Sequence, residues 1–257
     1  MGTEQAPLSS REMMQDMLRR HYRDAREAKK EGRLVCWSTS IAPQELLTTM
    51  DIVTLYPENH AAAIGSRKGS MEFIAHTESM GYSSDLCSYA RVNLAYAKLQ
   101  YSQAENMPLP DFLLCTNNIC HTVLKWYENL SKELKIPLIM FDTPFNHTDE
   151  VQEHNIKYMN AQLHHAIDQL EDITGKKFDL DGIVFHSNRS CKLMDFRQYE
   201  VQRRVLEECG IPSVIFDGDQ TDPRLFSETQ YETRIQALAE MMQENKRKKA
   251  RLERWNL

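Results

Sequence analysis

Short apolar runs alternate with stretches of helical periodicity along almost the whole chain, and this alternation limits the possible folds most. The apolar runs that predict β-strands are Leu34–Ser38, Ile52–Tyr56, Asp111–Cys115, Leu138–Phe141, Gly182–His186 and Ser213–Asp217. Helical patterns cover residues 10–31, 44–50, 67–80, 85–101, 119–134, 150–173 and 195–208, and a last one begins near Ser227. Strands separated by helices pair in parallel, so the sequence predicts an α/β fold of mostly parallel sheets with flanking helices.

The best candidate for a domain boundary is the polar segment GKKFDLD at residues 175–181. It follows a long helical pattern and precedes a new strand, where turn-forming residues are typical of a link. We expect an N-terminal helix within residues 1–32 and a larger α/β domain at 33–178. Residues 179–257 would form a reduced C-terminal α/β domain with a terminal helix.

The charge and the apolar content exclude two classes of partner. The 257 residues carry a net charge of -6, which disfavours a broad nucleic-acid surface because phosphate binding needs clustered lysine and arginine. No segment approaches the roughly 18 apolar residues that span a bilayer. Residues 1–30 lack the apolar core of a signal peptide, so we expect a cytoplasmic protein that binds neither nucleic acid nor membrane.

Six cysteines in a reducing compartment are buried apolar residues, catalytic thiols or metal ligands. Cys36 and Cys115 lie inside expected strands and Cys209 lies at a helix end, so we expect all three to be buried. The other three come after polar turns, at helix starts or beyond strand ends: Cys87, Cys120 and Cys191. Open α/β folds build ligand sites there, and helix N-termini favour thiolates. Without a C-x-x-C clip, unrelated thiols, zinc and an iron–sulfur cluster all stay open from the spacing alone.

Several blocks around these cysteines resemble one family. The blocks are GYSSDLCSYARVNLAYAKL, TNNICHTVLKWYENL, IPLIMFDTPF, ITGKKFD and GIVFHSNRSCK. They follow one another as in the 2-hydroxyacyl-CoA dehydratase / benzoyl-CoA reductase family, in subunits of the D-component type, and the resemblance covers about residues 33–241. Family subunits are normally longer, and this chain lacks a substantial segment between residues 179 and 181.

The resemblance implies a cofactor and a reaction. Cys87, Cys120 and Cys191 fall on the positions of three cysteines that hold a [4Fe–4S] cluster and leave one iron open to water or substrate. The implied enzyme is a lyase of anaerobic metabolism that eliminates water from a 2-hydroxyacyl-CoA through a ketyl radical. Its partners would be a related second subunit, giving a heterodimer, and an ATP-dependent iron–sulfur activator protein that supplies the electron. This chain has no phosphate-binding loop of its own.

Two alternatives to this reaction stay open. One keeps the cluster but makes the chain a subunit of a reductase, similar to benzoyl-CoA reductase or to the double-cubane relatives. The other is a shortened, non-catalytic chain that binds a partner, which the missing segment favours. The sequence specifies neither the acyl group nor the oligomeric state.

Polar residues follow the first two expected strands. Ser40 and Glu58 lie at strand carboxyl ends, on the same side as the cysteine loops, and could position the substrate or relay its proton near the open iron. In the alternative interpretation Ser40 caps the next helix and Glu58 closes a turn with Asn59.

Overall fold

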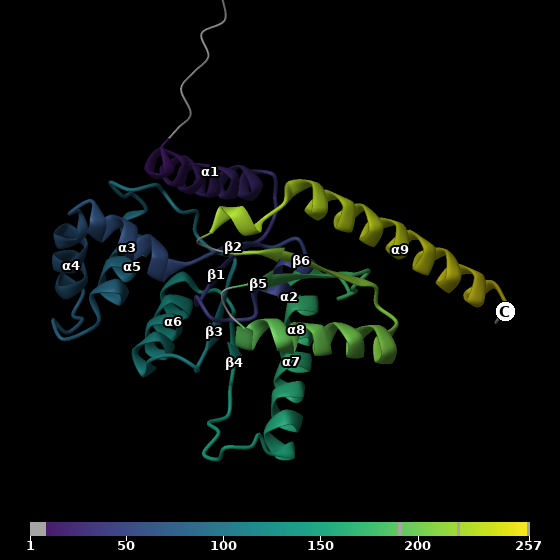
Figure 1. Cartoon of the computed structure of the whole chain (residues 1–257). Helices are drawn as coiled ribbons and strands as arrows, with labels where there is room; N and C mark the ends of the chain where they lie inside the picture. Colours follow the sequence, from purple (N-terminus) through teal and green to yellow (C-terminus); the bar gives the residue numbers. More distant parts are fainter. Residues whose placement is uncertain (1–8, 190–191, 220–221, 256–257) are drawn as a thin grey trace, which may run out of the picture. The chain divides into compact units, whose positions relative to one another are not determined.

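The computed structural model describes residues 9–189, 192–219 and 222–255 (Figure 1). The described chain forms two compact units, one comprising the residues up to Phe178 and the other those from Asp179 on. All strand pairs recorded in them are parallel, as the alternation of strands and helices predicts. Among the described residues, no helix combines the length and apolarity that crossing a lipid bilayer requires.

The first unit is built on a four-stranded parallel sheet in the order β2-β1-β3-β4. Its strands are β1 (Val35–Ser38), β2 (Val53–Leu55), β3 (Phe112–Thr116) and β4 (Leu138–Phe141). Its helices are α1 (Ser10–Lys30), α2 (Gln44–Thr49), α3 (Pro57–Ser66), α4 (Ser70–Ser79), α5 (Ser88–Leu99), α6 (His121–Leu134) and α7 (Glu153–Thr174). In this order β2 lies on one side of β1, and the chain then crosses over to add β3 on the other side of β1. The topological switch point therefore lies between the carboxyl ends of β1 and β3.

Helices cover both faces of this sheet, because successive side chains of its central strands point to opposite faces. Trp37 and Leu113 pack in one apolar cluster with residues of α1, α3, α4, α5 and α6. Cys36 and Phe112, their neighbours in sequence, pack in the other cluster with residues of α2 and α7. Both faces of β1 and β3 are thus buried, as is usual for a parallel sheet.

Helix α3 corrects one expectation. In the alternative interpretation Glu58 closes a turn with Asn59, but Pro57 is the first residue of a ten-residue helix that carries Glu58 in its first turn. Proline fits the first helical position, because the N–H that it lacks has no intrahelical acceptor there. An acidic residue in the first turn also complements the helix dipole. Figure 1 shows α3 beside α4 and α5, on the side of the sheet away from α7.

The second unit is a βαβ arrangement followed by a long helix. Strands β5 (Ile183–Asn188) and β6 (Ser213–Gly218) pair in parallel over their full length. Helix α8 (Lys192–Arg204) joins them and ends in a single π-helical turn (Val205–Cys209), and α9 spans Glu228–Trp255. The buried apolar side chains among its described residues include Val214, Ile215 and Leu238.

Candidate active site at the switch point

A pocket of about 420 Å³ opens at the switch point of the first unit. Its walls are the segment after β1, the end of β3 and the end of β4, and they include Ser40, Thr116 and Thr143. Hydrogen bonds between strand ends fix these walls. The backbone N–H of Thr39 donates to the Leu114 carbonyl oxygen over 3.0 Å, and the backbone N–H of Thr116 donates to Thr39 Oγ1 over 3.3 Å. We call this cavity the switch-point pocket.

The structure brings Ser40 and Glu58 together beside this pocket. The backbone N–H of Ser40 donates to Glu58 Oε1 over 3.4 Å. Burial raises the pKa of the Glu58 carboxyl, and the hydrogen bonds from its own backbone N–H and from Ser40 only partly oppose that effect. The other carboxylate oxygen, Oε2, is buried and has no hydrogen bond of standard geometry. A half-buried carboxyl in this state keeps its proton to a higher pH than an exposed one.

Tyr127 on α6 is the second polar group that faces this carboxyl. Its side chain is fully buried, and burial followed by the negative charge of Glu58 raises the pKa of its phenol well above the usual value. The phenol oxygen and Glu58 Oε2 are both buried without a hydrogen bond of standard geometry. Perturbed, incompletely satisfied groups next to a residue that lines a pocket, here Ser40, are typical of functional sites. Sequence analysis does not find Tyr127, because a tyrosine inside a helical pattern is most simply explained as a core residue.

Cys87 and Cys120 occupy equivalent positions at the starts of two helices. Cys87 is the N-cap residue of α5 and Cys120 is the N-cap residue of α6. Both are free, exposed cysteines, and neither side chain is engaged in capping its helix. Each thiol is therefore accessible at the positive end of a helix dipole.

Helices α5 and α6 run parallel, so both cysteines lie at the same end of the pair. Trp126 Nε1 donates to Asn93 Oδ1 over 2.9 Å, and each of these residues lies six positions after its cysteine. Toward the other end of the helices Lys98 is paired with Glu133. Pairs that advance together along both helices show that the two helices point in the same direction. Packed helix axes are roughly 8–10 Å apart, which sets the scale of the separation between the two N-caps.

The remaining described cysteines separate into two groups. Cys36 and Cys115 are fully buried in β1 and β3 as expected, and burial raises the pKa of Cys115 to about 12 and that of Cys36 well above its usual value. The expectation for Cys209 is wrong, because it is exposed at the end of the π-helical turn. Gly210 ends that turn with a positive φ of 64°, and the turn holds no buried residue.

Cys191 lies outside the described residues, so the structure does not place it relative to the other two cysteines. Among the described residues, no group of three or more histidine, cysteine, aspartate and glutamate side chains is arranged to hold a metal ion. The described residues that precede Cys191 in the sequence are at the end of β5. Arg189 forms an ion pair of 2.9 Å with Asp217 on β6, which lowers the pKa of that carboxyl.

Comparison with protein-family models gives a match to the D-component of 2-hydroxyglutaryl-CoA dehydratase over residues 39–181 and again over 176–242. The chain belongs to this family. The alpha subunit of (R)-2-hydroxyisocaproyl-CoA dehydratase from Clostridioides difficile is 33% identical over 396 aligned positions, covering 93% of this chain and 97% of that protein. The alpha subunit of (R)-2-hydroxyglutaryl-CoA dehydratase from Acidaminococcus fermentans is 24% identical, covering 93% and 98%. One of the subunits of benzoyl-CoA reductase from Thauera aromatica is 32% identical over 155 positions, covering 59% and 36%.

The family comparison also locates the missing segment. The alignment with the hydroxyisocaproyl-CoA dehydratase subunit has 396 positions and this chain has 257 residues, so more than a hundred positions have no counterpart here. The two matches to the family model meet within residues 176–181. The two structural units meet between Phe178 and Asp179. The family residues that are absent therefore belong at this junction.

Two further residues of the family blocks support the switch-point pocket. Asn117 Oδ1 accepts a hydrogen bond of 2.7 Å from the backbone N–H of Thr143, and its amide nitrogen donates to Asp142. These bonds join the loop after β3, which leads to Cys120, to the loop after β4. The polar residues of the blocks TNNIC and FDTPF thus form a contact between two loops at the edge of the sheet. Sequence analysis places both loops at this edge but does not pair them.

Proposed function

We propose that this chain is the catalytic subunit of an enzyme that eliminates water from a 2-hydroxyacyl-CoA thioester. The observation that carries the proposal is the joint position of Ser40, Glu58 and the switch-point pocket in a chain of this family. Relatives named as dehydratase subunits cover 93% of the chain. The benzoyl-CoA reductase subunit covers only 59% of it, so dehydration is favoured over reduction.

The proposed reaction removes the hydroxyl group from C2 and a hydrogen from C3 of the acyl chain as water. No net oxidation results, so an electron supplied to the thioester at the start is returned at the end. Glu58 holds or takes up a proton at its carboxyl, for which a raised pKa suits it. Ser40 contributes the backbone N–H that orients this carboxyl and is itself a residue of the pocket wall.

Cys87, Cys120 and Cys191 are the residues that we propose hold a [4Fe–4S] cluster. The donor set fits in two respects: Cys87 and Cys120 are free and exposed, and they cap the same end of a parallel helix pair. Cys191 follows the end of β5 in the sequence and completes the set that the family resemblance implies. Such a cluster, when bound, supplies one-electron chemistry and an iron that can take an oxygen ligand.

The proposed partners follow from the family. Relatives named as alpha subunits belong to enzymes with a second subunit, and we propose that this chain also pairs with a related one. Electron supply is assigned to a separate ATP-dependent iron–sulfur activator protein. The proposed location is the cytoplasm.

Anaerobic purification of the full chain, followed by iron and acid-labile sulfide analysis, tests the cluster. The result expected is about four iron and four sulfide per chain, with a broad visible absorbance. Cys87→Ser and Cys120→Ser each lower the iron content strongly, and so does Cys191→Ser. Cys209→Ser is the matched control, because Cys209 is exposed but lies outside the proposed site.

The dehydratase assignment is tested separately, by adding a reduced activator protein and the second subunit to the loaded chain. Turnover of a 2-hydroxyacyl-CoA to the unsaturated thioester supports it, and turnover of an aromatic CoA thioester to a reduced ring would support the reductase instead. A chain that binds no iron under these conditions is the shortened, non-catalytic form.

A further inference from the structure

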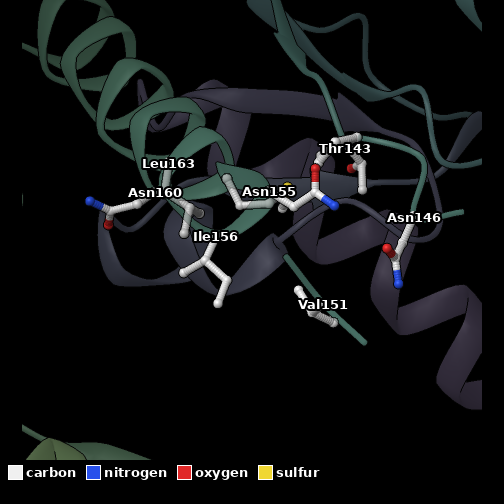
Figure 2. Close-up of a pocket in the computed structure, with 9 residues that line it drawn as sticks. Thr143, Asn146, Val151, Asn155, Ile156, Asn160 and Leu163 are labelled. Atoms are coloured by element: carbon white, nitrogen blue, oxygen red, sulfur yellow. The ribbon is translucent and has the colours of Figure 1, made fainter. Parts of the chain in front are cut away.

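An open apolar pocket of about 460 Å³ lies beside the start of α7 (Figure 2). Apolar side chains line most of it, among them Val151, Ile156, Met159 and Leu163, and the polar atoms around them are neutral hydroxyl and amide groups. None of the described residues that line it carries a charge. Its volume is within the range of small-molecule sites. We call it the α7 pocket.

The apolar side chains of the α7 pocket lie unusually open to solvent. Ile156 is 58% exposed and Val151 is 64% exposed, and Phe145 in the same loop is 78% exposed. Figure 2 shows Val151 and Ile156 at the edge of the open space. Contiguous exposed apolar surface of this kind marks a binding site, because leaving it in water is unfavourable.

The α7 pocket adjoins the switch-point pocket. Thr143 and Met159 line both cavities, so the two lie next to each other at the edge of the sheet. The end at Ser40 is polar and adjoins the Glu58 carboxyl, whereas the end at Ile156 is apolar. A molecule that fits both ends has a reactive polar head and an apolar tail.

On the basis of the proposed function, we propose that the α7 pocket holds the acyl chain of the thioester and selects an uncharged branched aliphatic or aromatic group. A chain that ends in a carboxylate is disfavoured, because no cation among the described residues lines the pocket to replace the water that the carboxylate loses. Lys157, the nearest lysine in the sequence, forms an ion pair of 2.8 Å with Glu153 and does not line the pocket. A very short chain is also disfavoured, because it leaves the apolar walls uncovered.

Calorimetric titration of the full chain with saturated acyl-CoA thioesters tests this selectivity without turnover, since these ligands lack the 2-hydroxyl group. Each methylene group that is buried strengthens binding about three- to fourfold. We therefore expect isocaproyl-CoA to bind at least about tenfold more tightly than propionyl-CoA. Glutaryl-CoA should bind more weakly than isocaproyl-CoA, although its chain is of similar length.

The variant Ile156→Lys places a cation in the pocket wall at an exposed helical position. It should weaken isocaproyl-CoA binding about tenfold, strengthen glutaryl-CoA binding and leave propionyl-CoA binding unchanged. Met71→Lys is the matched control, because Met71 is 72% exposed on α4 and lines neither pocket.

Three other outcomes would overturn the proposal in distinguishable ways. Equal affinity for all three thioesters, unchanged by Ile156→Lys, rejects the α7 pocket as the acyl site and leaves the proposed function standing. If all three thioesters bind equally and Ile156→Lys binds the second subunit more weakly, the same surface is assigned to that partner instead. Failure of every thioester to bind rejects the thioester chemistry itself, and with it both proposals.

Discussion

At the scale of single residues, Glu58 has the most informative environment in the first unit. One of its carboxylate oxygens is buried without a hydrogen bond of standard geometry, and the other receives a long hydrogen bond from Ser40. Burial is the main cause of its raised pKa. The folded protein therefore holds the Glu58 proton more tightly than the unfolded chain does, and ionisation of this carboxyl opposes folding.

The variant Glu58→Gln should reveal this cost when its free energy of unfolding is compared with that of the wild type at different pH values. The contribution of the protonated Glu58 to wild-type stability is fully present below the unfolded pKa of about 4.3 and is lost as the pH rises through the raised folded pKa. Glutamine resembles the protonated acid and does not ionise. We expect equal unfolding free energies near pH 4 and a variant that is more stable by on the order of 1 kcal/mol at pH 8. Denaturant titrations at the two pH values measure the difference.

In the control variant for this measurement, Glu128→Gln, the expected change in stability has the opposite sign. Glu128 is partly exposed, and its hydrogen bonds with Lys125 lower the pKa of its carboxyl. Ionisation of Glu128 therefore favours folding, so Glu128→Gln should be slightly less stable than wild type at pH 8 and equal to it at low pH. A Glu58→Gln variant that behaves like Glu128→Gln would contradict the assigned environment.

At the scale of elements, the sequence predicts most of the strands and helices because their apolar periodicity is strong. The strand Leu138–Phe141 is predicted at its observed bounds, since four apolar residues follow Pro137 directly. Helix α3 is not predicted, because Pro57, Glu58 and Asn59 are as common in turns as in a first helical turn. The parallel alignment of α5 and α6 is also beyond sequence reasoning, since it depends on long-range contacts such as the bond between Asn93 and Trp126.

That alignment leads to a prediction about Cys87 and Cys120. Because both residues cap the same end of a parallel pair, a bifunctional maleimide with a spacer of about 10 Å should join them within one chain. Peptide mass spectrometry of the anaerobic, metal-free chain identifies the linked pair. Cross-links of either cysteine to itself in a second chain, without the intrachain product, would show that the two N-caps lie at different ends.

The bond between Trp126 and Asn93 should contribute measurably to the stability of the first unit. Both side chains are buried, so Asn93→Ala leaves the indole N–H without an acceptor. An unsatisfied buried donor costs about 1–3 kcal/mol, which denaturant unfolding detects. The comparison is Asn129→Ala, whose amide donates to a carbonyl of its own helix and which should change stability much less. Similar losses in both variants would mean that the interhelical bond adds little.

At the scale of the whole molecule, the two units differ in how much apolar surface they bury. The described part of the first unit has two apolar clusters, one on each face of a four-stranded sheet. The second has a two-stranded sheet, and its described residues bury few apolar side chains, Val214 and Ile215 among them. Exposed apolar residues on its strands and helices include Val184 and Leu206.

We therefore expect the second unit to be the less stable part of the isolated chain. A two-stranded sheet is marginal by itself, and a domain below about 80 residues rarely gains more than about 3–5 kcal/mol from a single core. Amide hydrogen exchange should be complete in β5 and β6 while β1 and β3 stay protected.

Trypsin should cut first at Lys176 or Lys177, which are exposed in the irregular segment between the units. Addition of the second subunit should slow both processes if that chain covers the apolar surface. Protection of β5 and β6 equal to that of β1 and β3 in the isolated monomer would show that the short form is self-sufficient.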